Sequence, residues 1–306
     1  MRDLFAIVML FGIYSLLSAG FLVNLDAVDV ALTEAAVGAG ITTVLMLGTL
    51  ALTSRKEKRY SHSVLIPLLV VLVTGVALVY GTLDMPHFSD PNAPIHGHVA
   101  PRYIEKSGEE IGIPNIVTSV LASYRGYDTL GETVVIFTAG IGVLSLLGTF
   151  VTGRRPRPSI AMRHHVVLRI IAKALIPLIL LYALYVQFHG DYSPGGGFQA
   201  GVIFASAFIL YTIIFGLEMA QRIMTPGLIR ILMALGVLIY GGTGVVALLL
   251  GGNYLDYNML SHDPVHGQHL GIFFVELGVG ITVTAVMLSI FFNFTGRSTL
   301  PPEEKP

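Results

Sequence analysis

The chain of 306 residues is too apolar for a soluble domain, because 54% of its residues are hydrophobic and 12% are charged, whereas roughly 25% charged residues is usual in soluble proteins. Its mean hydropathy of +0.75 and its formal net charge of -1 exclude a basic protein that binds nucleic acid. The absence of cysteine from the sequence excludes disulfides, thiolate metal sites and iron–sulfur clusters.

Eight apolar runs are each long enough to cross a bilayer, which takes about 20 residues. They predict an all-α integral membrane protein with about eight transmembrane helices. In chain order the runs are Leu4–Val23, Ala27–Leu50, Val64–Leu83, Leu130–Val151, Val166–Phe188, Phe198–Leu217, Leu228–Leu250 and Leu270–Phe292. For the first run, a signal peptide cleaved near Ala19 is an alternative interpretation, although the start of the run has no net positive charge.

The basic residues between these runs lie mostly on one side of the membrane. If the N-terminus is cytoplasmic, the basic clusters near Arg55, Arg154 and Arg222 are cytoplasmic as well. The basic residues on the other side are then Arg102, Lys106 and Arg125. Because cytoplasmic loops carry an excess of lysine and arginine, we expect both termini in the cytoplasm.

The order of the runs divides the chain into three pieces. Residues 1–83 are predicted to form a three-helix unit, residues 84–153 an outer loop followed by one membrane helix, and residues 163–300 a four-helix unit. The main boundary is the basic, proline-containing linker Gly153–Ser159. Within the outer loop, Pro114–Tyr124 is predicted to be a short interfacial helix that begins at the proline.

A glycine-rich loop separates the fifth and sixth runs. Irregular backbone at membrane depth survives only against protein or a water-filled cavity, so this loop is a candidate functional segment. Its backbone is expected either to hold an ion or to form a tight turn that packs against a partner subunit. A histidine beside an aspartate, His189 and Asp191, suits proton transfer at the outer surface. The candidate residues of the loop are His189, Asp191, Pro194, Gly195, Gly196 and Gly197.

Ionisable residues inside the predicted membrane helices are further candidates, because a charge at the bilayer centre costs on the order of 2.5–3.5 kcal/mol on insertion scales. Oxygen ligands suit Na+ and also carry protons, so the carboxylates are expected to form an ion or proton path, with Glu34 as the first candidate. The alternative for the carboxylates is pairing with polar groups of a neighbouring subunit. The alternative for Lys173 is that its long side chain extends to the membrane surface. These residues are Asp29, Glu34, Glu132, Lys173 and Glu276.

Histidines in the outer loops do not predict a metal site. His262, His266 and His269 have helical spacing, but Pro264 and Gly267 are expected to interrupt a helix there. The sequence has no nucleophile–base pair, P-loop or dinucleotide motif, so we predict no catalytic residues, no metal and no cofactor.

The stretch Phe188–Ile203, FHGDYSPGGGFQAGVI, resembles the signature of the B subunit of multisubunit Na+/H+ antiporters of the Mrp type, also called Mnh, and residues 163–295 fit that family. Asp26–Leu45 is similar to the MbhD-like unit near the C-terminus of the large A subunit. Gly131–Gly148 resembles the MbhE-like segment that follows it. The chain therefore looks like a fusion of the A-subunit tail, with MbhD-like residues 1–83 and MbhE-like residues 84–153, to the B subunit.

This resemblance implies an accessory or ion-path subunit of a cation/proton antiporter, which uses the proton gradient to export Na+ for pH and Na+ homeostasis. The implied location is a prokaryotic inner membrane. The implied partners are the large A- and D-type subunits, the small C-, E-, F- and G-type subunits, Na+, H+ and lipid, without nucleic acid. Similar segments occur in hydrogenase-like and sulfane-reductase-like complexes, so a membrane-arm subunit of such an oxidoreductase is one alternative. A structural scaffold subunit is the other.

Overall fold

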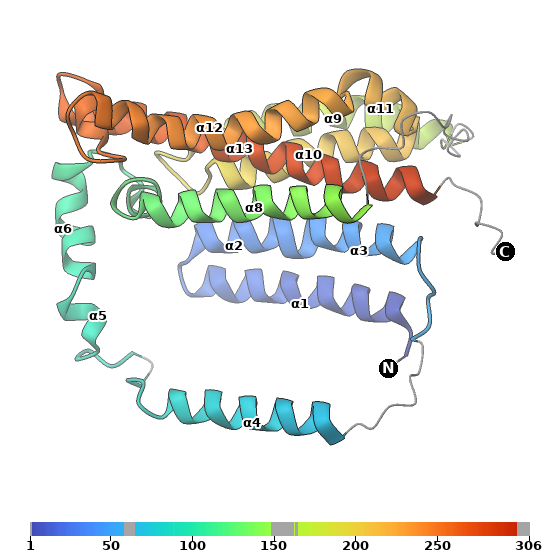
Figure 1. The fold of residues 1–306 in the computed structure, drawn as a ribbon, viewed down its shortest axis with the longest axis horizontal. Helices are drawn as coiled ribbons and strands as arrows, with labels where there is room; N and C mark the ends of the chain where they lie inside the picture. The colour runs from blue at the N-terminus through green and yellow to red at the C-terminus, as the bar shows by residue number, and fades with distance from the viewer. Residues whose placement is uncertain (1, 58–64, 88, 148–161, 163–164, 299–306) are drawn as a thin grey trace.

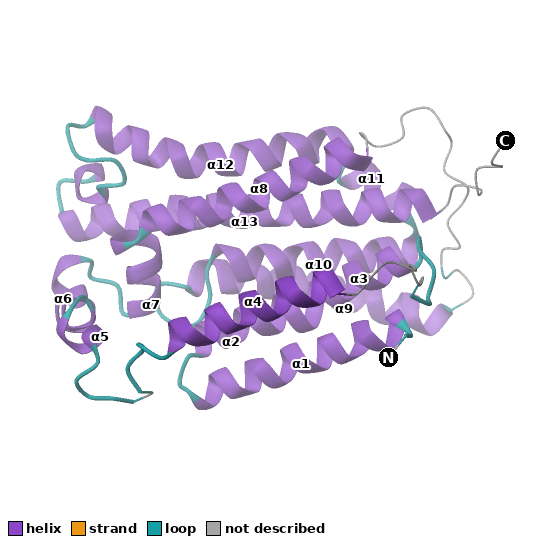
Figure 2. Ribbon diagram, turned by 60° about the horizontal axis from the view of Figure 1, so that its bottom comes forward, coloured by secondary structure: helices purple, strands orange, loops and turns teal. Residues whose placement is uncertain are grey.

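The structure, a computed structural model, describes residues 2–57, 65–87, 89–147, 162 and 165–298. Within these ranges the chain is helical, and 8 helical spans are long and apolar enough to cross a membrane, as predicted (Figures 1 and 2). The spans are α1 (Leu4–Asn24), the helix made of α2, η1 and α3, α4 (Leu65–Thr82), α8 (Gly126–Leu147), α9 (Val166–His189), α10 (Gly197–Phe215), α12 (Pro226–Leu249) and α13 (Pro264–Ser298).

The second span contains a π-helical segment. It begins as α2 (Val28–Glu34), continues as the π-helix η1 (Ala35–Thr42) and ends as α3 (Thr43–Leu50). Gly38 in the π segment lies directly against Ser15 of α1, where an added Cβ would collide with the serine hydroxyl. Small residues therefore let these two helices approach closely.

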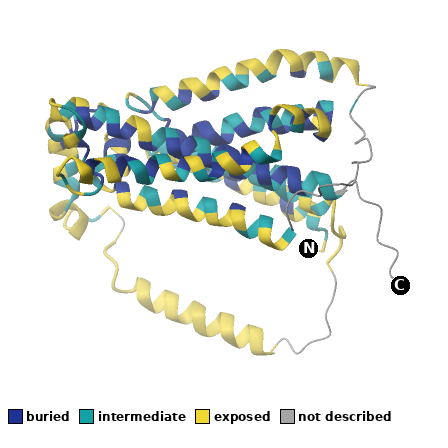
Figure 3. Ribbon diagram, turned by 45° about the horizontal axis from the view of Figure 1, so that its top comes forward, coloured by how far each residue is buried: buried dark blue, intermediate teal, exposed yellow. Residues whose placement is uncertain are grey.

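The helix α4 stands apart from the bundle. All of its residues are exposed, and Figures 1 and 3 show it alone at one edge of the molecule. The chain returns to the bundle through the short helix α5 (Pro94–Gly97) and the longer α6 (Ala100–Glu110). An apolar helix without cover from its own chain has to face lipid or another subunit.

The expected interfacial helix in the outer loop is present but starts later than predicted. Asn115 accepts a hydrogen bond from the backbone N–H of Val117 and caps α7 (Ile116–Thr118), which continues as the π-helix η2 (Ser119–Tyr124). The prediction that Pro114 opens this helix was wrong, because an asparagine cap satisfies a free N–H of the first turn, which proline cannot do.

A polar cluster attaches α6 to η2 outside the membrane spans. The carboxylate of Glu110 accepts hydrogen bonds from the Tyr124 hydroxyl at 2.5 Å and from the Arg102 guanidinium at 3.2 and 3.3 Å. These contacts, that of Tyr124 first, hold the pKa of Glu110 below its usual value of 4.5. Burial, with the hydrogen bond to Glu110, raises the pKa of Tyr124 to about 12. The cluster therefore keeps α6 beside the segment that carries Asn115.

The core lies around α13, which packs against α8, α10 and α12. The predicted interruption at Pro264 and Gly267 was wrong, since one continuous helix runs from Pro264 to Ser298. Pro264 occupies the first helical position, where no backbone N–H is needed. Gly267 faces the backbone carbonyl of Tyr257, where a side chain would collide. The glycine is thus required by packing and does not end the helix.

Glycines set the distance between α12 and α13. An added Cβ at Gly278 would lie 2.7 Å from the carbonyl oxygen of Gly236, and one at Gly236 would overlap the hydroxyl of Thr282. One turn further along α12, the buried Tyr240 hydroxyl donates to the carbonyl of Gly126 at 2.7 Å and so connects α12 to the start of α8. Close helix packing and this buried hydrogen bond hold α8 in place.

Substitution of Gly236 by valine is expected to destabilise the bundle. The added methyl groups have no space between α12 and α13, and overpacking of this kind costs about 1–3 kcal/mol. The matched control is Gly242→Val on the same helix, where an added Cβ meets nothing within 4 Å. Thermal unfolding of the purified protein in detergent should show a lower midpoint for Gly236→Val alone. Equal midpoints for the two variants would contradict this packing.

Candidate functional site

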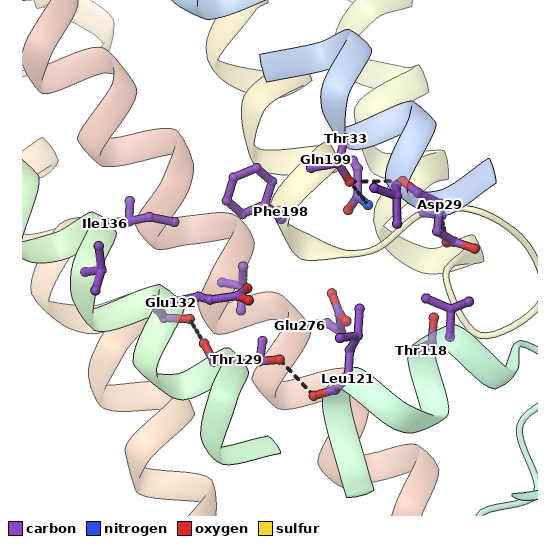
Figure 4. A pocket seen from close by; sticks show the side chains of 16 residues that line it. Asp29, Thr33, Thr118, Leu121, Thr129, Glu132, Ile136, Phe198, Gln199 and Glu276 are labelled. Carbon is purple, nitrogen blue, oxygen red and sulfur yellow. Dashed lines mark hydrogen bonds between the residues drawn. The ribbon is translucent and has the colours of Figure 1, made fainter. Parts of the chain in front are cut away.

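A pocket of about 550 Å³ lies between α2, the α7–η2 segment, α8, α10 and α13. Figure 4 shows the carboxylates of Asp29, Glu132 and Glu276 around it, each from a different helix. The other polar side chains of its wall are Thr33, Thr118, Thr129, Thr133 and Gln199. Three of the five intramembrane ionisable residues identified in the sequence therefore line the same pocket.

Asp29 joins α2 to the glycine-rich loop. Its Oδ1 accepts from the backbone N–H of Gly195 at 3.3 Å and from the Asn115 side-chain amide at 3.5 Å. One turn along α2, Thr33 donates to the Asp29 carbonyl at 3.0 Å and accepts from the Gln199 amide at 2.8 Å. Asp29 and Thr33 thus present a polar edge of α2 to the pocket.

The side chain of Glu276, which belongs to α13, lies against the N-terminus of α10. Its Oε2 accepts a hydrogen bond from the backbone N–H of Gly197, the first residue of α10. The positive end of the helix dipole stabilises a carboxylate at this position. A Cβ on Gly197 would collide with the Glu276 carbonyl. Gly196 has φ +127, in the region that favours glycine. Two adjacent glycines are therefore needed for this contact.

Glu132 forms the open side of the pocket. It lies on the exposed face of α8, whereas Asp29 and Glu276 are half-buried. One turn before it, Asp128 pairs with Arg125. The pocket therefore extends from Glu276, inside the bundle, to a carboxylate on the surface of this chain.

The glycine-rich loop is packed within this chain. Asn115 donates to the carbonyls of Gly190 and Ser193, both at 3.1 Å, and Thr118 donates to the same Gly190 carbonyl at 2.8 Å. On the other side, an added Cβ at Gly195 would lie 2.7 Å from a carbonyl oxygen of α9. The expected tight turn is present and packs against α7, α9 and α13 of its own chain, and its packing against a partner subunit stays a prediction. Carbonyls of the loop are occupied by these hydrogen bonds.

The two polar residues at the start of the loop have separate partners. The carboxylate of Asp191 pairs with Nδ1 of His269 on α13 at 3.2 Å. His189 stacks on Tyr185, with ring centroids 4.7 Å apart, and lies near Tyr192. The sequence drew attention to His269 only for its spacing from His262 and His266, and it did not indicate Asn115. The contacts of both residues with the loop were missed, because each is about 75 residues or more from its loop partner.

The two other intramembrane candidates lie outside the pocket. Glu34 ends α2, and its carboxylate lies beside Gly38 and Ser15, on the side of α1. Lys173 is on the exposed face of α9. Among the residues that the structure describes, no three His, Asp or Glu side chains are placed to hold a metal ion together.

Three protein-family models match consecutive parts of the chain. Residues 1–55 match the MbhD family and residues 68–165 match the MbhE family, both of which are named for subunits of MBH. Residues 167–289 match a domain related to the MnhB subunit of Na+/H+ antiporters. Asp29, Glu132 and Glu276 therefore come from three different matched regions.

Known proteins are similar to this chain over the same regions. A protein of Staphylococcus aureus strain Newman, named as antiporter subunit mnhB2, is 35% identical over 134 residues, which are 43% of this chain and 94% of that protein. The solved Mrp complex from Dietzia sp. DQ12-45-1b contains a chain with a TM-score of 0.74 and 26% identity. That match covers 100% of this chain but 34% of the longer Dietzia chain. A chain of the archaeal membrane-bound sulfane sulfur reductase has a TM-score of 0.58 and 31% identity, over 76% of this chain and 97% of that one.

Substitution of Asn115 by alanine should loosen the glycine-rich loop. It leaves the Ser193 carbonyl without its side-chain donor and removes one of the two side-chain donors to the Gly190 carbonyl. An acceptor left without its hydrogen bond costs about 1–3 kcal/mol. Hydrogen–deuterium exchange of residues 190–197 should become faster. The control is Asn92→Ala in the outer loop, where the backbone N–H makes the hydrogen bond to Asp90. Unchanged exchange in Asn115→Ala would show that Thr118 and the glycine packing hold the loop without Asn115.

Proposed function

Because this chain belongs to the family of MnhB subunits of Na+/H+ antiporters, we propose that its pocket of three carboxylates is part of the ion path of a multisubunit antiporter. The chain is a multi-pass membrane protein and a subunit of an Mrp/Mnh-type complex. Its neighbours in that complex are proposed to be the large A- and D-type subunits and the small C-, E-, F- and G-type subunits. The cargo is Na+ and H+.

One observation carries this proposal: the pocket forms where the three matched regions meet. Asp29 comes from the MbhD-like region, Glu132 from the MbhE-like region and Glu276 from the MnhB-like region. A carboxylate inside a membrane protein is costly unless it is paired or faces a water-filled cavity. Three of them in one cavity favour a path for cations or protons over three separate structural pairs.

The chemistry of the pocket suits exchange between Na+ and H+. Carboxylate, hydroxyl and amide oxygens are hard ligands of the kind that alkali and alkaline-earth ions prefer. Asp29, Thr33 and Gln199 offer such oxygens along one edge, and Glu276 lies opposite. The backbone N–H of Gly197 stabilises the ionised form of Glu276. A proton or a Na+ ion that reaches Glu276 competes with this N–H for the same oxygen.

The wider organisation of the chain is proposed along the same lines. Three parts, residues 1–83, 84–153 and 163–300, correspond to the two pieces of the A-subunit tail and to the B subunit. Both termini lie in the cytoplasm, and the glycine-rich loop lies near the outer surface. The distribution of basic residues supports this orientation. Glu34 is proposed as a path residue outside the pocket, next to the π segment of the second span.

Substitution of Glu276 by glutamine tests the path directly. We expect Na+-dependent dequenching of a pH dye to fall to background in everted vesicles from an antiporter-deficient host that carries the complete gene cluster. The control is Glu218→Gln, which removes an exposed carboxylate paired with Arg222 on the short helix α11 (Leu217–Ile223). This control should transport normally. Normal transport in Glu276→Gln, with the complex intact on a native gel, would contradict the proposal.

The proposed role of Glu34 is tested separately by Glu34→Gln in the same assay.

The orientation has its own test. The chain has no cysteine, so single cysteines report their side of the membrane without background. Asn92→Cys should react with a membrane-impermeant maleimide added to intact cells, whereas Ser54→Cys should react after the cells are opened. The reverse pattern would overturn the orientation.

A second function is favoured by the likeness to the sulfane sulfur reductase chain, of which 97% is covered. In that case this chain is a membrane-arm subunit, the redox chemistry belongs to other subunits, and the pocket still handles ions. Purification of the tagged chain with its partners separates the two functions. Antiporter-like subunits alone support the first, and co-purified redox subunits support the second.

A further inference from the structure

Two cations lie on α9, away from the carboxylate pocket: Lys173 is exposed, and Arg169 is half-buried. Arg169 and Lys173 are one helical turn apart and line a hollow of about 200 Å³ together with Val166 and Ile170. The helix α9 packs mainly against α10 and leaves most of its surface exposed. In the described part of the chain, neither cation forms an ion pair with a carboxylate.

The two cations differ in their contacts: Arg169 is held by a neighbouring ring, and Lys173 is exposed. The Arg169 guanidinium lies over the ring of Phe215 in α10, 5.7 Å from the ring centroid, and is held there by a cation–π contact. Lys173 is exposed, and side chains on a helix lean toward its N-terminus. The ammonium of Lys173 is therefore directed toward Arg169 and toward the end of the membrane span. A fixed guanidinium and an adaptable ammonium converge on the same hollow.

A separate apolar groove lies further along α9. It has a volume of about 540 Å³ and is lined by Leu178, Leu181, Tyr182, Leu184, Tyr185 and Phe188. At 3.6 residues per turn, Lys173 and Leu181 lie about 80° apart around the helix. Leu181 is about 12 Å from Lys173 along the axis, which is within the roughly 15 Å of hydrocarbon in one leaflet.

From this arrangement we infer that α9 carries a site for one anionic phospholipid. The phosphate lies between Arg169 and Lys173, and an acyl chain runs along α9 past Ile170 as far as Leu181, within one leaflet. Charge complementarity selects an anionic headgroup, because lysine and arginine side chains near a membrane surface attract anionic lipids. The exposed apolar side chains of α9 between the cations and Leu181 favour a lipid over a soluble anion.

This site assigns Lys173 a role that does not involve the ion path. Lys173 lines the hollow on α9 and is not among the residues that line the carboxylate pocket. Lipid binding at Lys173 and ion passage at Glu276 are therefore separable by experiment. The test of lipid binding does not depend on the outcome of the transport test, or the reverse.

Native mass spectrometry of the purified complex tests the site. The complex is incubated with phosphatidylglycerol or with phosphatidylcholine of the same acyl chains, and the bound lipids are counted. We expect the wild type to retain one more phosphatidylglycerol than Lys173→Gln does, and Lys173→Arg to restore it. The control, Arg222→Gln, removes a cation that is already paired with Glu218 and should leave the count unchanged. Phosphatidylcholine should not distinguish the variants.

Two results would overturn the inference. Equal retention of phosphatidylglycerol by the wild type and Lys173→Gln would mean that another subunit covers this face or that the cations bind nothing. Loss of the lipid in Arg222→Gln as well would mean that the total positive charge, and not this site, attracts it. The double variant Arg169→Gln, Lys173→Gln has to be compared with Lys173→Gln. Loss of the contact between Arg169 and Phe215 is by itself able to disturb the packing of α9.

Discussion

The contact between Gly197 and Glu276 is the constraint on which the rest of the site depends. The first turn of α10 lies so close to α13 that a Cβ at Gly197 would overlap the backbone of Glu276. This approach places the free N–H groups and the positive dipole end of α10 at the Glu276 carboxylate. A carboxylate that would be costly in an apolar bundle thus gains a backbone hydrogen bond from α10 and faces the pocket. The three consecutive glycines are explained by packing and by this electrostatic role together.

The same loop connects regions that match separate subunit families. Its Gly195 N–H contacts Asp29 in the MbhD-like region, Asn115 in the MbhE-like region holds its carbonyls, and Gly197 contacts Glu276 in the MnhB-like region. The pocket therefore lies at a junction that has become internal to one chain. The loop and the first residue of α10 thus contact two of the three carboxylates, Asp29 and Glu276.

The sequence was sufficient for the helices, because runs of about 20 apolar residues have a single solution in a bilayer. It also identified Asp29, Glu132 and Glu276, since an ionisable residue stands out in such runs. It did not reveal that these three share a pocket, because their helices are far apart in the chain and are brought together by packing, such as that of Gly140 in α8 against Val286 in α13. Nor did it reveal that Asn115 and His269 hold the loop, or that Pro264 opens α13. The contacts of Asn115 and His269 depend on tertiary packing, which leaves no periodic signal. Proline at the first helical position is a local signal, which was interpreted as an interruption.

The most direct test of the central claim is whether Na+ interacts with the pocket carboxylates. Infrared difference spectra of the complex in lipid, recorded with and without Na+, detect changes in carboxylate vibrations. If Na+ binds at the pocket carboxylates, a Na+-induced carboxylate band should disappear when Glu276 is replaced by glutamine and persist when Glu218 is replaced. A difference spectrum that is the same in the wild type and in Glu276→Gln would contradict it.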